Sequence, residues 1–281
     1  MNIRYKTFTE TGLKRKTNQD RITARTNEKI SLFAVADGMG GHSKGEFASE
    51  KVIKYLDTLW NEISDFSGDF QTAVDMIISA LDKANTEIFR YAESKKIICG
   101  STASVLLIFG DFYAVINIGD SPIYRADIKK AWHESTEHSY DVIACKSTGA
   151  APNEIDESRK GRLIRAVGIS DKLLPSVKTG RIVGKQTFLI CSDGVSRYFT
   201  GKKIFGYLRR TAAGKINLPE LSDILKNKVY SMGAEDNLSA IMVCTYTDES
   251  YKSDSRKFLI IIAAAIIFFI LWAAINIFIL F

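Results

Sequence analysis

The stretch ASVLLIFGDFYAVINI, residues 103–118, decides the fold class of this 281-residue chain. Its two halves, 103–109 and 112–118, are rich in β-branched and aromatic side chains, a composition that favours strands. Gly110 and Asp111 join the halves, and a two-residue connection that contains glycine is typical of a hairpin. The stretch therefore predicts two buried, antiparallel strands within the domain.

Further strand-like and helical patterns lie on both sides of this hairpin. Apolar runs of strand type occupy residues 31–36, 187–191 and 240–246. Apolar residues at helical spacing predict helices at residues 47–63, 70–89 and 219–232. Helices grouped between strands that form hairpins are typical of a layered α+β domain. We predict such a domain, with a mostly antiparallel sheet, over residues 1–247.

The composition excludes several classes of protein. Apolar residues make up 46% of the chain and charged residues 25%, which is the balance of a globular protein and not of a disordered, collagen-like or coiled-coil chain. The net charge of +6 is spread along the sequence, so we expect no nucleic-acid partner. The four cysteines lie far apart without a CxxC pair, which indicates buried free thiols in a reducing compartment.

The C-terminal residues 258–281 differ from the rest of the chain. They include no charged residue, and Asn276 is the only strongly polar one. Because about 20 apolar residues are enough to cross a bilayer, this run predicts a transmembrane helix. Residues 248–257 form a short polar linker before it. Three basic residues stand just before the run and none follows it: Lys252, Arg256 and Lys257.

This charge distribution predicts the orientation of the chain. By the positive-inside rule, the basic flank keeps the N-terminal domain in the cytoplasm. Residues 1–16 are charged throughout and lack the apolar core of a cleavable signal peptide. We therefore expect a single-pass protein of the cell membrane, with the lipid bilayer as a partner and the folded domain on the cytoplasmic side.

Aspartates stand where the strand-like runs begin or end. Asp37, Asp120 and Asp193 each follow such a run and neighbour a glycine, Asp236 precedes the last run, and Asp20 follows a basic stretch. A single aspartate beside glycine most often marks a turn. However, strand ends at one edge of a sheet are neighbours in space, and carboxylates brought together there need a cation. Their oxygens suit Mg²⁺ or Mn²⁺.

Other catalytic chemistries lack the residues that they need. The chain has three histidines, and it contains no HExxH, GxSxG or GxxxxGK[ST] motif. The glycine-rich run DGMGG, residues 37–41, lacks the GxGxxG spacing of a dinucleotide-binding loop. A metal site made of carboxylates is therefore the favoured hypothesis for the chemistry.

Six short motifs occur in order along the chain, at residues 12–20, 35–49, 100–103, 119–121, 191–194 and 233–237. In this order they resemble the metal-dependent Ser/Thr protein phosphatases of type 2C (PPM), in particular their compact bacterial members. The resemblance covers residues 1 to about 247. It implies a sandwich of two antiparallel β-sheets flanked by helices, with a metal centre at one end of the sandwich.

The resemblance also implies a set of metal ligands. Asp37 would bridge two ions, Mn²⁺ or Mg²⁺, and the carbonyl oxygen of Gly38 would complete the coordination of one of them. Asp193 and Asp236 would hold the other side of the pair. Asp120 matches a position that is linked to a weaker third ion.

Residues near the ligands match the family as well. Asp20 would hold water molecules that are bound to the ions, without contacting the ions itself. Asn237 is expected to support the ligands in a similarly indirect way. Arg15 matches the arginine that grips the substrate phosphate, since a planar guanidinium suits two phosphate oxygens. Together with the three ligand aspartates, Arg15 is expected to be catalytic.

The implied activity is hydrolysis of phosphoserine and phosphothreonine in proteins. A water that bridges the two ions would attack phosphorus in line, so no phosphoenzyme is expected. Met39 stands where some members carry a histidine, and we do not assign His42 as the general acid. The expected partners are phosphorylated proteins, among them a Ser/Thr kinase or its substrates.

Two other functions fit parts of the sequence. One is a catalytically inactive relative that binds phosphoproteins, which the presence of Asp37, Asp193 and Asp236 disfavours. The other is a membrane-anchored adaptor with an incidental phosphatase fold. The polar stretch 132–161 is expected to be a surface flap, and its sequence does not indicate a substrate preference.

Overall fold

The computed structural model of the chain describes residues 1–40, 43–140, 142 and 163–247. Within it, Met1–Tyr246 forms one compact unit. Most of the expected flap, the linker 248–257 and the expected membrane span 258–281 lie outside the described residues. Within the ranges that are described, no helix has both the length and the apolar character needed to span a bilayer.

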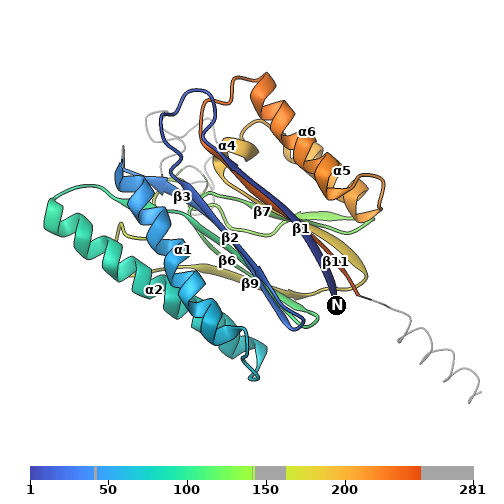
Figure 1. Cartoon of the computed structure of the whole chain (residues 1–281), viewed down its shortest axis with the longest axis horizontal. Coiled ribbons are helices and arrows are strands. Elements are labelled where there is room, and N and C mark those ends of the chain that lie inside the picture. The colour runs from blue at the N-terminus through green and yellow to red at the C-terminus, as the bar shows by residue number, and fades with distance from the viewer. Residues whose placement is uncertain (41–42, 141, 143–162, 248–281) are drawn as a thin grey trace, which may run out of the picture. The chain divides into compact units, whose positions relative to one another are not determined.

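Two antiparallel sheets form the centre of the compact unit (Figure 1). The order in the first sheet is β1 (Asn2–Glu10), β11 (Leu238–Tyr246), β10 (Lys185–Cys191), β7 (Ile123–Ala126) and β8 (Ala131–His133). The order in the second sheet is β2 (Asp20–Thr26), β3 (Ile30–Met39), β5 (Ala103–Phe109), β6 (Phe112–Ile118) and β9 (Ser176–Arg181), and β4 (Gly100–Ser101) also pairs with β3. The prediction of an α+β fold with antiparallel strands is confirmed.

Helices cover the outer face of each sheet (Figure 1). The second sheet is covered by α1 (Ser43–Ile63) and α2 (Phe70–Lys95), and the first by α5 (Gly201–Ala212) and α6 (Leu218–Ser231). The short helix α4 (Asp193–Ser196) follows β10 directly. Helix α6 begins with a capping box, in which Asn217 and Glu220 satisfy each other's backbone N–H groups.

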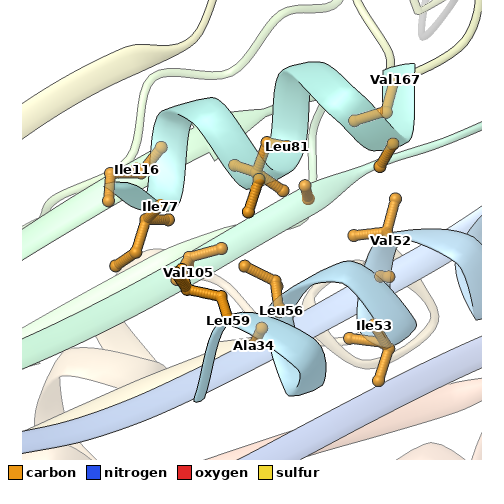
Figure 2. Close-up of a cluster of buried hydrophobic side chains, with 14 of the residues drawn as sticks. Ala34, Val52, Ile53, Leu56, Leu59, Ile77, Leu81, Val105, Ile116 and Val167 are labelled. Carbon is orange, nitrogen blue, oxygen red and sulfur yellow. The ribbon is translucent and has the colours of Figure 1, made fainter. Parts of the chain in front are cut away.

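Side chains of strand β3 alternate between two apolar cores, one on each face of the second sheet. Leu32 and Ala34 point to the core under α1 and α2, part of which Figure 2 shows, whereas Phe33 and Val35 point to the core between the sheets. This alternation follows from the two-residue period of a strand. A third apolar cluster lies between the first sheet and helices α5 and α6. The cysteines within the described residues, Cys99, Cys191 and Cys244, are buried free thiols, as predicted.

The predicted hairpin is confirmed to the residue, because β5 and β6 pair with Phe109 opposite Phe112. Gly110 between them has a φ of 56°, in the left-handed region that favours glycine. The strand predicted at residues 31–36 was too short. It continues to Met39 because neighbouring strands pair with the extension, and Asp37 therefore lies within β3, opposite Asp20 of β2.

Candidate metal centre

The five predicted aspartates gather at one end of the two sheets. Asp20 begins β2 and Asp37 lies near the end of β3, whereas Asp193 follows β10 and Asp236 precedes β11. Burial raises the pKa of Asp37 well above its usual value, and the charges of the other four, including Asp120, raise it further. The five carboxyl groups are therefore close enough to repel one another, as the sequence predicted.

Glycines allow the loops that carry these carboxylates to approach closely. A Cβ atom on Gly194 would lie 1.9 Å from the carbonyl oxygen of Asn237. A Cβ atom on Gly12, whose φ is 77°, would lie 2.2 Å from the carbonyl oxygen of Asp236. Any side chain at either position would force apart the loops around Asp193 and Asp236, so the conformation requires glycine.

Space beside the carbonyl oxygen of Gly38 depends on a further glycine. A Cβ atom on Gly45, in the first turn of α1, would lie 2.6 Å from that oxygen. The Gly38 N–H donates to the carbonyl oxygen of Gln19 at 3.2 Å, which ties β3 to the loop before β2. The backbone at Gly38 is thus fixed next to Asp37, and the lack of a Cβ atom on Gly45 leaves room for its carbonyl group.

Asp20 has a buried oxygen without a partner. The residue is only 2% exposed, and its Oδ2 accepts a hydrogen bond from Ser192 Oγ at 2.8 Å. Its Oδ1 has no hydrogen-bond partner among the described residues. Burial raises the pKa of Asp20 to about 6, and the charges of Asp193 and Asp236 act in the same direction. A buried oxygen of this kind fits a site in which an ordered water or ion completes its contacts.

The turn that carries Asp120 is held by a histidine. The backbone N–H of Gly119 donates to His138 Nδ1 at 3.1 Å, and the backbone N–H of His138 donates to the Gly119 carbonyl oxygen at 3.0 Å. Burial raises the pKa of Asp120 to about 7, and the charge of Asp193 contributes. Sequence reasoning assigned no role to His138, since its contact with Gly119 depends on the tertiary fold.

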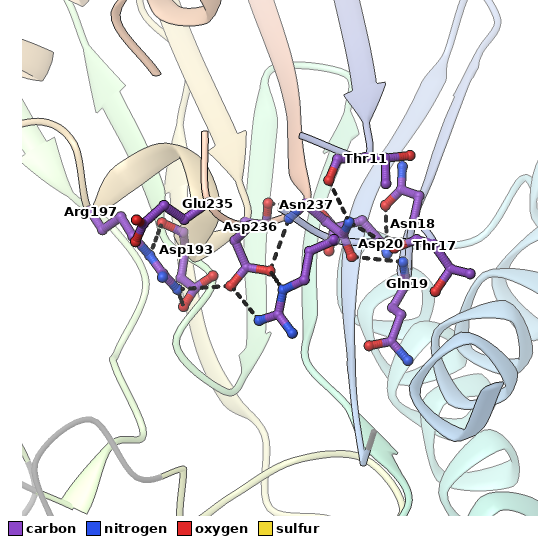
Figure 3. A network of polar contacts seen from close by, with 12 residues as sticks. Thr11, Thr17, Asn18, Gln19, Asp20, Asp193, Arg197, Glu235, Asp236 and Asn237 are labelled. Atoms are coloured by element: carbon purple, nitrogen blue, oxygen red, sulfur yellow. Dashed lines mark hydrogen bonds and ion pairs between the residues drawn. The ribbon is translucent and has the colours of Figure 1, made fainter. Parts of the chain in front are cut away.

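Two arginines bind the carboxylates. Arg15 Nε lies 2.7 Å from Asp236 Oδ1, and Arg15 Nη2 lies 2.9 Å from Asp236 Oδ2. Arg197 Nη2 contacts Asp193 Oδ2 and lies 3.4 Å from Asp236 Oδ2 (Figure 3). Sequence reasoning missed Arg197, although it stands four residues after Asp193, a spacing at which helical side chains meet.

These ion pairs involve carboxylates that are also expected to bind metal ions. Among the residues that the structure describes, no group of three histidine, cysteine, aspartate or glutamate side chains is arranged to hold an ion. The two guanidinium groups contact oxygens of Asp193 and Asp236 that bound ions would need. The donor set of carboxylate and carbonyl oxygens nevertheless suits Mn²⁺ or Mg²⁺. Because Arg15 holds both oxygens of Asp236, an ion that binds this carboxylate would compete with Arg15.

The raised pKa values predict how the stability of the metal-free protein depends on pH. In the unfolded chain aspartates titrate near 4, whereas Asp20 and Asp120 titrate at about 6 and about 7 in the folded state. The folded protein therefore binds more protons between these values, and its stability falls as pH rises from about 5 to 7.5. In EDTA we expect a lower Tm at pH 7.5 than at pH 5.5.

The variant Asp20→Asn tests the cause of this pH effect. Because the amide carries no charge, the Tm in EDTA should depend less on pH and should rise at pH 7.5. In a domain of this size, a change of about 1 kcal/mol in the free energy of unfolding shifts the Tm by about 2–4 °C. A wild-type Tm that increases across the window in EDTA would contradict the inferred repulsion.

The family model for protein phosphatase 2C matches residues 13–226. The fold, the gathered aspartates and this match define a metal-dependent phosphatase. The chain belongs to the protein phosphatase 2C family and is a protein-serine/threonine phosphatase that uses Mn²⁺ or Mg²⁺.

Two bacterial relatives support the assignment to this family. The chain is 30% identical over 244 residues to the serine/threonine phosphatase stp of Listeria innocua, which covers 84% of this chain and 93% of that protein. It is 25% identical over 246 residues to protein phosphatase PhpP of Streptococcus pneumoniae, covering 84% and 95%.

Solved structures share the fold. The S. agalactiae serine/threonine phosphatase has a TM-score of 0.77 and 23% identity, and the match covers 88% of this chain and 100% of that one. The catalytic domain of protein phosphatase PstP, solved in complex with 2 manganese ions, has a TM-score of 0.70 and 24% identity, covering 88% and 99%. The expected sandwich of two sheets flanked by helices is therefore confirmed.

Proposed function

We propose that this protein is a membrane-anchored phosphatase that hydrolyses phosphoserine and phosphothreonine in proteins at two divalent ions held by Asp37, Asp193 and Asp236. The observation that carries the catalytic part is the gathering of carboxyl groups from both sheets around Asp37. Arg15 and Arg197 offset part of the repulsion through Asp236 and Asp193, and bound cations would offset more of it.

The ligands have distinct places in this proposal. Asp37 would hold both ions from β3, and the Gly38 carbonyl oxygen would hold one of them. Asp193 and Asp236 would hold the other ion, and Asp120 would hold a weaker third ion. When bound, the ions would supply an acidified water as the nucleophile near neutral pH.

Asp20 and Asn237 support the ligands. The Oδ1 atom of Asp20, which lacks a partner among the described residues, would accept a hydrogen bond from an ordered water. Asn237 Nδ2 donates to the carbonyl oxygens of Thr11 and Thr17, both at 2.9 Å, and Asn237 Oδ1 accepts from the Gln19 N–H at 2.9 Å. Asn237 thereby fixes the loop between β1 and β2, which carries Arg15 (Figure 3).

Arg15 binds the substrate phosphate. Its side chain is 53% exposed, and it already holds two oxygens of one carboxylate in the planar, bidentate geometry that phosphate recognition uses. Arg15 would exchange this carboxylate for phosphate oxygens of the substrate. There it would offset negative charge on the phosphoryl group during the displacement.

The variant Arg15→Ala separates phosphate binding from metal binding. We expect kcat/KM for a phosphothreonine peptide to fall at least ~10-fold, which corresponds to the loss of one charged contact in the transition state. The Mn²⁺ affinity should stay the same or increase, because Asp236 loses a competing cation. Both would be measured by Mn²⁺ titration of activity and by calorimetry.

Arg25→Ala is the matched control. Arg25 also pairs with an aspartate, with Nε 3.0 Å from Asp57 Oδ1, and lies away from the carboxylate cluster. It should leave kcat/KM unchanged. A fall in Mn²⁺ affinity in Arg15→Ala that equals its loss of activity would show that Arg15 has a structural role instead.

The proposed anchor is the apolar run 258–281, with the compact unit in the cytoplasm and the basic residues of the linker 248–257 on the same side. Phosphorylated proteins at the membrane, including a Ser/Thr kinase or the substrates of that kinase, would then be its partners. The support for this is the length of the uncharged run and its one-sided basic flank.

Membrane fractionation tests the anchor. The full chain should sediment with membranes and resist alkaline carbonate extraction, and protease added to intact cells should not digest the compact unit. A chain that ends at Thr247 should appear in the soluble fraction and retain activity on a phosphopeptide, since all six motifs precede this residue. Release of the full chain by carbonate would refute the anchor, and digestion from outside would refute the orientation.

A further inference from the structure

A pocket of about 550 Å³ lies at the end of the first sheet opposite to the metal centre. Its walls come from the start of β1 and from the connection between α5 and α6. In the pairing of β1 with β11, Glu10 lies opposite Leu238 beside the metal centre, whereas Asn2 lies opposite Tyr246. The nine residues of β11 therefore separate the two ends by roughly 30 Å.

The pocket is basic. Arg4, Lys6 and Lys185 line it, and its described lining contains no aspartate or glutamate. Arg4 and Lys6 are exposed, and in the described part of the chain none of the three cations forms an ion pair with a carboxylate. Three positive charges without counter-charges favour an anionic ligand.

The sheet register brings these cations to one face. Arg4 lies opposite Cys244, and Lys185 lies opposite Tyr246, two residues further along β11. Burial raises the pKa of the Cys244 thiol, while the charges of Lys185 and Arg4 act in the other direction, which is consistent with both cations lying close to it. The three cations thus line one pocket between the sheet and the connection from α5 to α6.

The chain leaves the compact unit beside this pocket. Tyr246 ends β11 and pairs with Asn2 on one side and Lys185 on the other. The linker 248–257 can span at most about 35 Å before the proposed anchor 258–281 begins. A bilayer that holds the anchor therefore lies within reach of the pocket, whose charge complements that of an anionic membrane surface.

We propose that this pocket binds the phosphate-bearing headgroup of an anionic phospholipid in the membrane that holds the anchor. The inference rests on the proposed membrane anchoring. Docking at this end of the first sheet points the metal centre, at the opposite end, away from the bilayer and toward phosphoproteins in the cytoplasm. The pocket thereby fixes the orientation of the catalytic unit, whereas the anchor fixes only its location.

Hydrogen exchange of the full chain in lipid nanodiscs tests this inference. We would compare nanodiscs of phosphatidylcholine with nanodiscs that also contain phosphatidylglycerol. Backbone amides at the start of β1 and in the α5–α6 connection should exchange several-fold more slowly when phosphatidylglycerol is present. A third sample, phosphatidylcholine nanodiscs with soluble glycerol phosphate, should show no such protection.

Charge reversal provides the matched variants. The triple variant Arg4→Glu, Lys6→Glu and Lys185→Glu should lose the protection by phosphatidylglycerol and keep wild-type activity on a phosphothreonine peptide, which shows that it is folded. The control reverses three exposed lysines elsewhere, Lys29, Lys54 and Lys83, with the same change of net charge. It should keep the protection.

The outcomes separate this inference from the proposed anchor. A chain that does not insert into nanodiscs refutes the anchor and the lipid site together. A chain that inserts but shows equal protection in both lipids refutes the lipid site alone. Equal protection by soluble glycerol phosphate would show that the pocket takes a soluble anion and would overturn the assignment to a lipid.

Discussion

Removal of divalent ions with EDTA should abolish phosphate release from a phosphothreonine peptide, and Mn²⁺ or Mg²⁺ should restore it. The carboxylates, the Gly38 carbonyl group and Arg15 provide ligands and a cation, but they provide no nucleophile of their own. Bound ions would supply the nucleophile as an acidified water. We expect the residual rate in EDTA to be indistinguishable from the rate without enzyme.

The control for this experiment is the fold. Circular dichroism should be unchanged in EDTA, because the cores of the sandwich are apolar and do not include the carboxylates. Full activity in the chelator would contradict the proposed ion-dependent mechanism. An inactive protein at saturating Mn²⁺ would instead favour the catalytically inactive, phosphoprotein-binding alternative.

The variants Asp37→Asn and Asp193→Asn should each lose at least ~10²-fold in kcat, which is the scale of losing a key electrostatic contact in an active site. The amide keeps nearly the same shape and removes one negative charge. Asp37 should show the larger effect, since it is proposed to contact both ions. Mn²⁺ affinity should fall in both variants.

Asp75→Asn is the matched control for these variants. Asp75 is an exposed aspartate on α2, away from the carboxylate cluster, and its loss should leave turnover unchanged. The thermal stability of Asp37→Asn in EDTA should not fall, because this substitution removes repulsion among the carboxyl groups. Near-normal turnover in either variant would show that its aspartate is not a metal ligand.

The parts of the fold that were predictable have strong local patterns. The β5–β6 hairpin combines two apolar runs with a glycine-containing connection, and helices α1, α2 and α6 carry apolar residues at helical spacing. By contrast, β1 and β9 are outer strands in which most residues are partly or fully exposed, so they lack the apolar runs that marked the buried strands. Helix α5 is short and contains Gly206, which weakens the local signal for a helix.

Like the fold, the candidate site has parts that were predictable from the sequence and parts that were not. Four of the aspartates were predictable because each stands at a boundary of a strand-like run, and such boundaries meet at one edge of a sheet. Asp20 follows a basic stretch instead, and its role came from the family resemblance. The position of Asp37 inside β3 was not, since it depends on pairing with β2 and β4. The ion pairs of Arg197 and the hydrogen bonds of His138 join segments by tertiary contacts, and single-sequence patterns do not specify such partners.

The most direct test of the proposed centre is a crystal structure grown with Mn²⁺ and measured at the manganese absorption edge. We predict two anomalous peaks next to Asp37, one shared with Asp193 and Asp236 and the other beside the Gly38 carbonyl oxygen, with Arg15 released from Asp236. If manganese lay elsewhere, or if Arg15 and Arg197 still held the carboxylates at saturating Mn²⁺, the proposed two-metal centre would be contradicted.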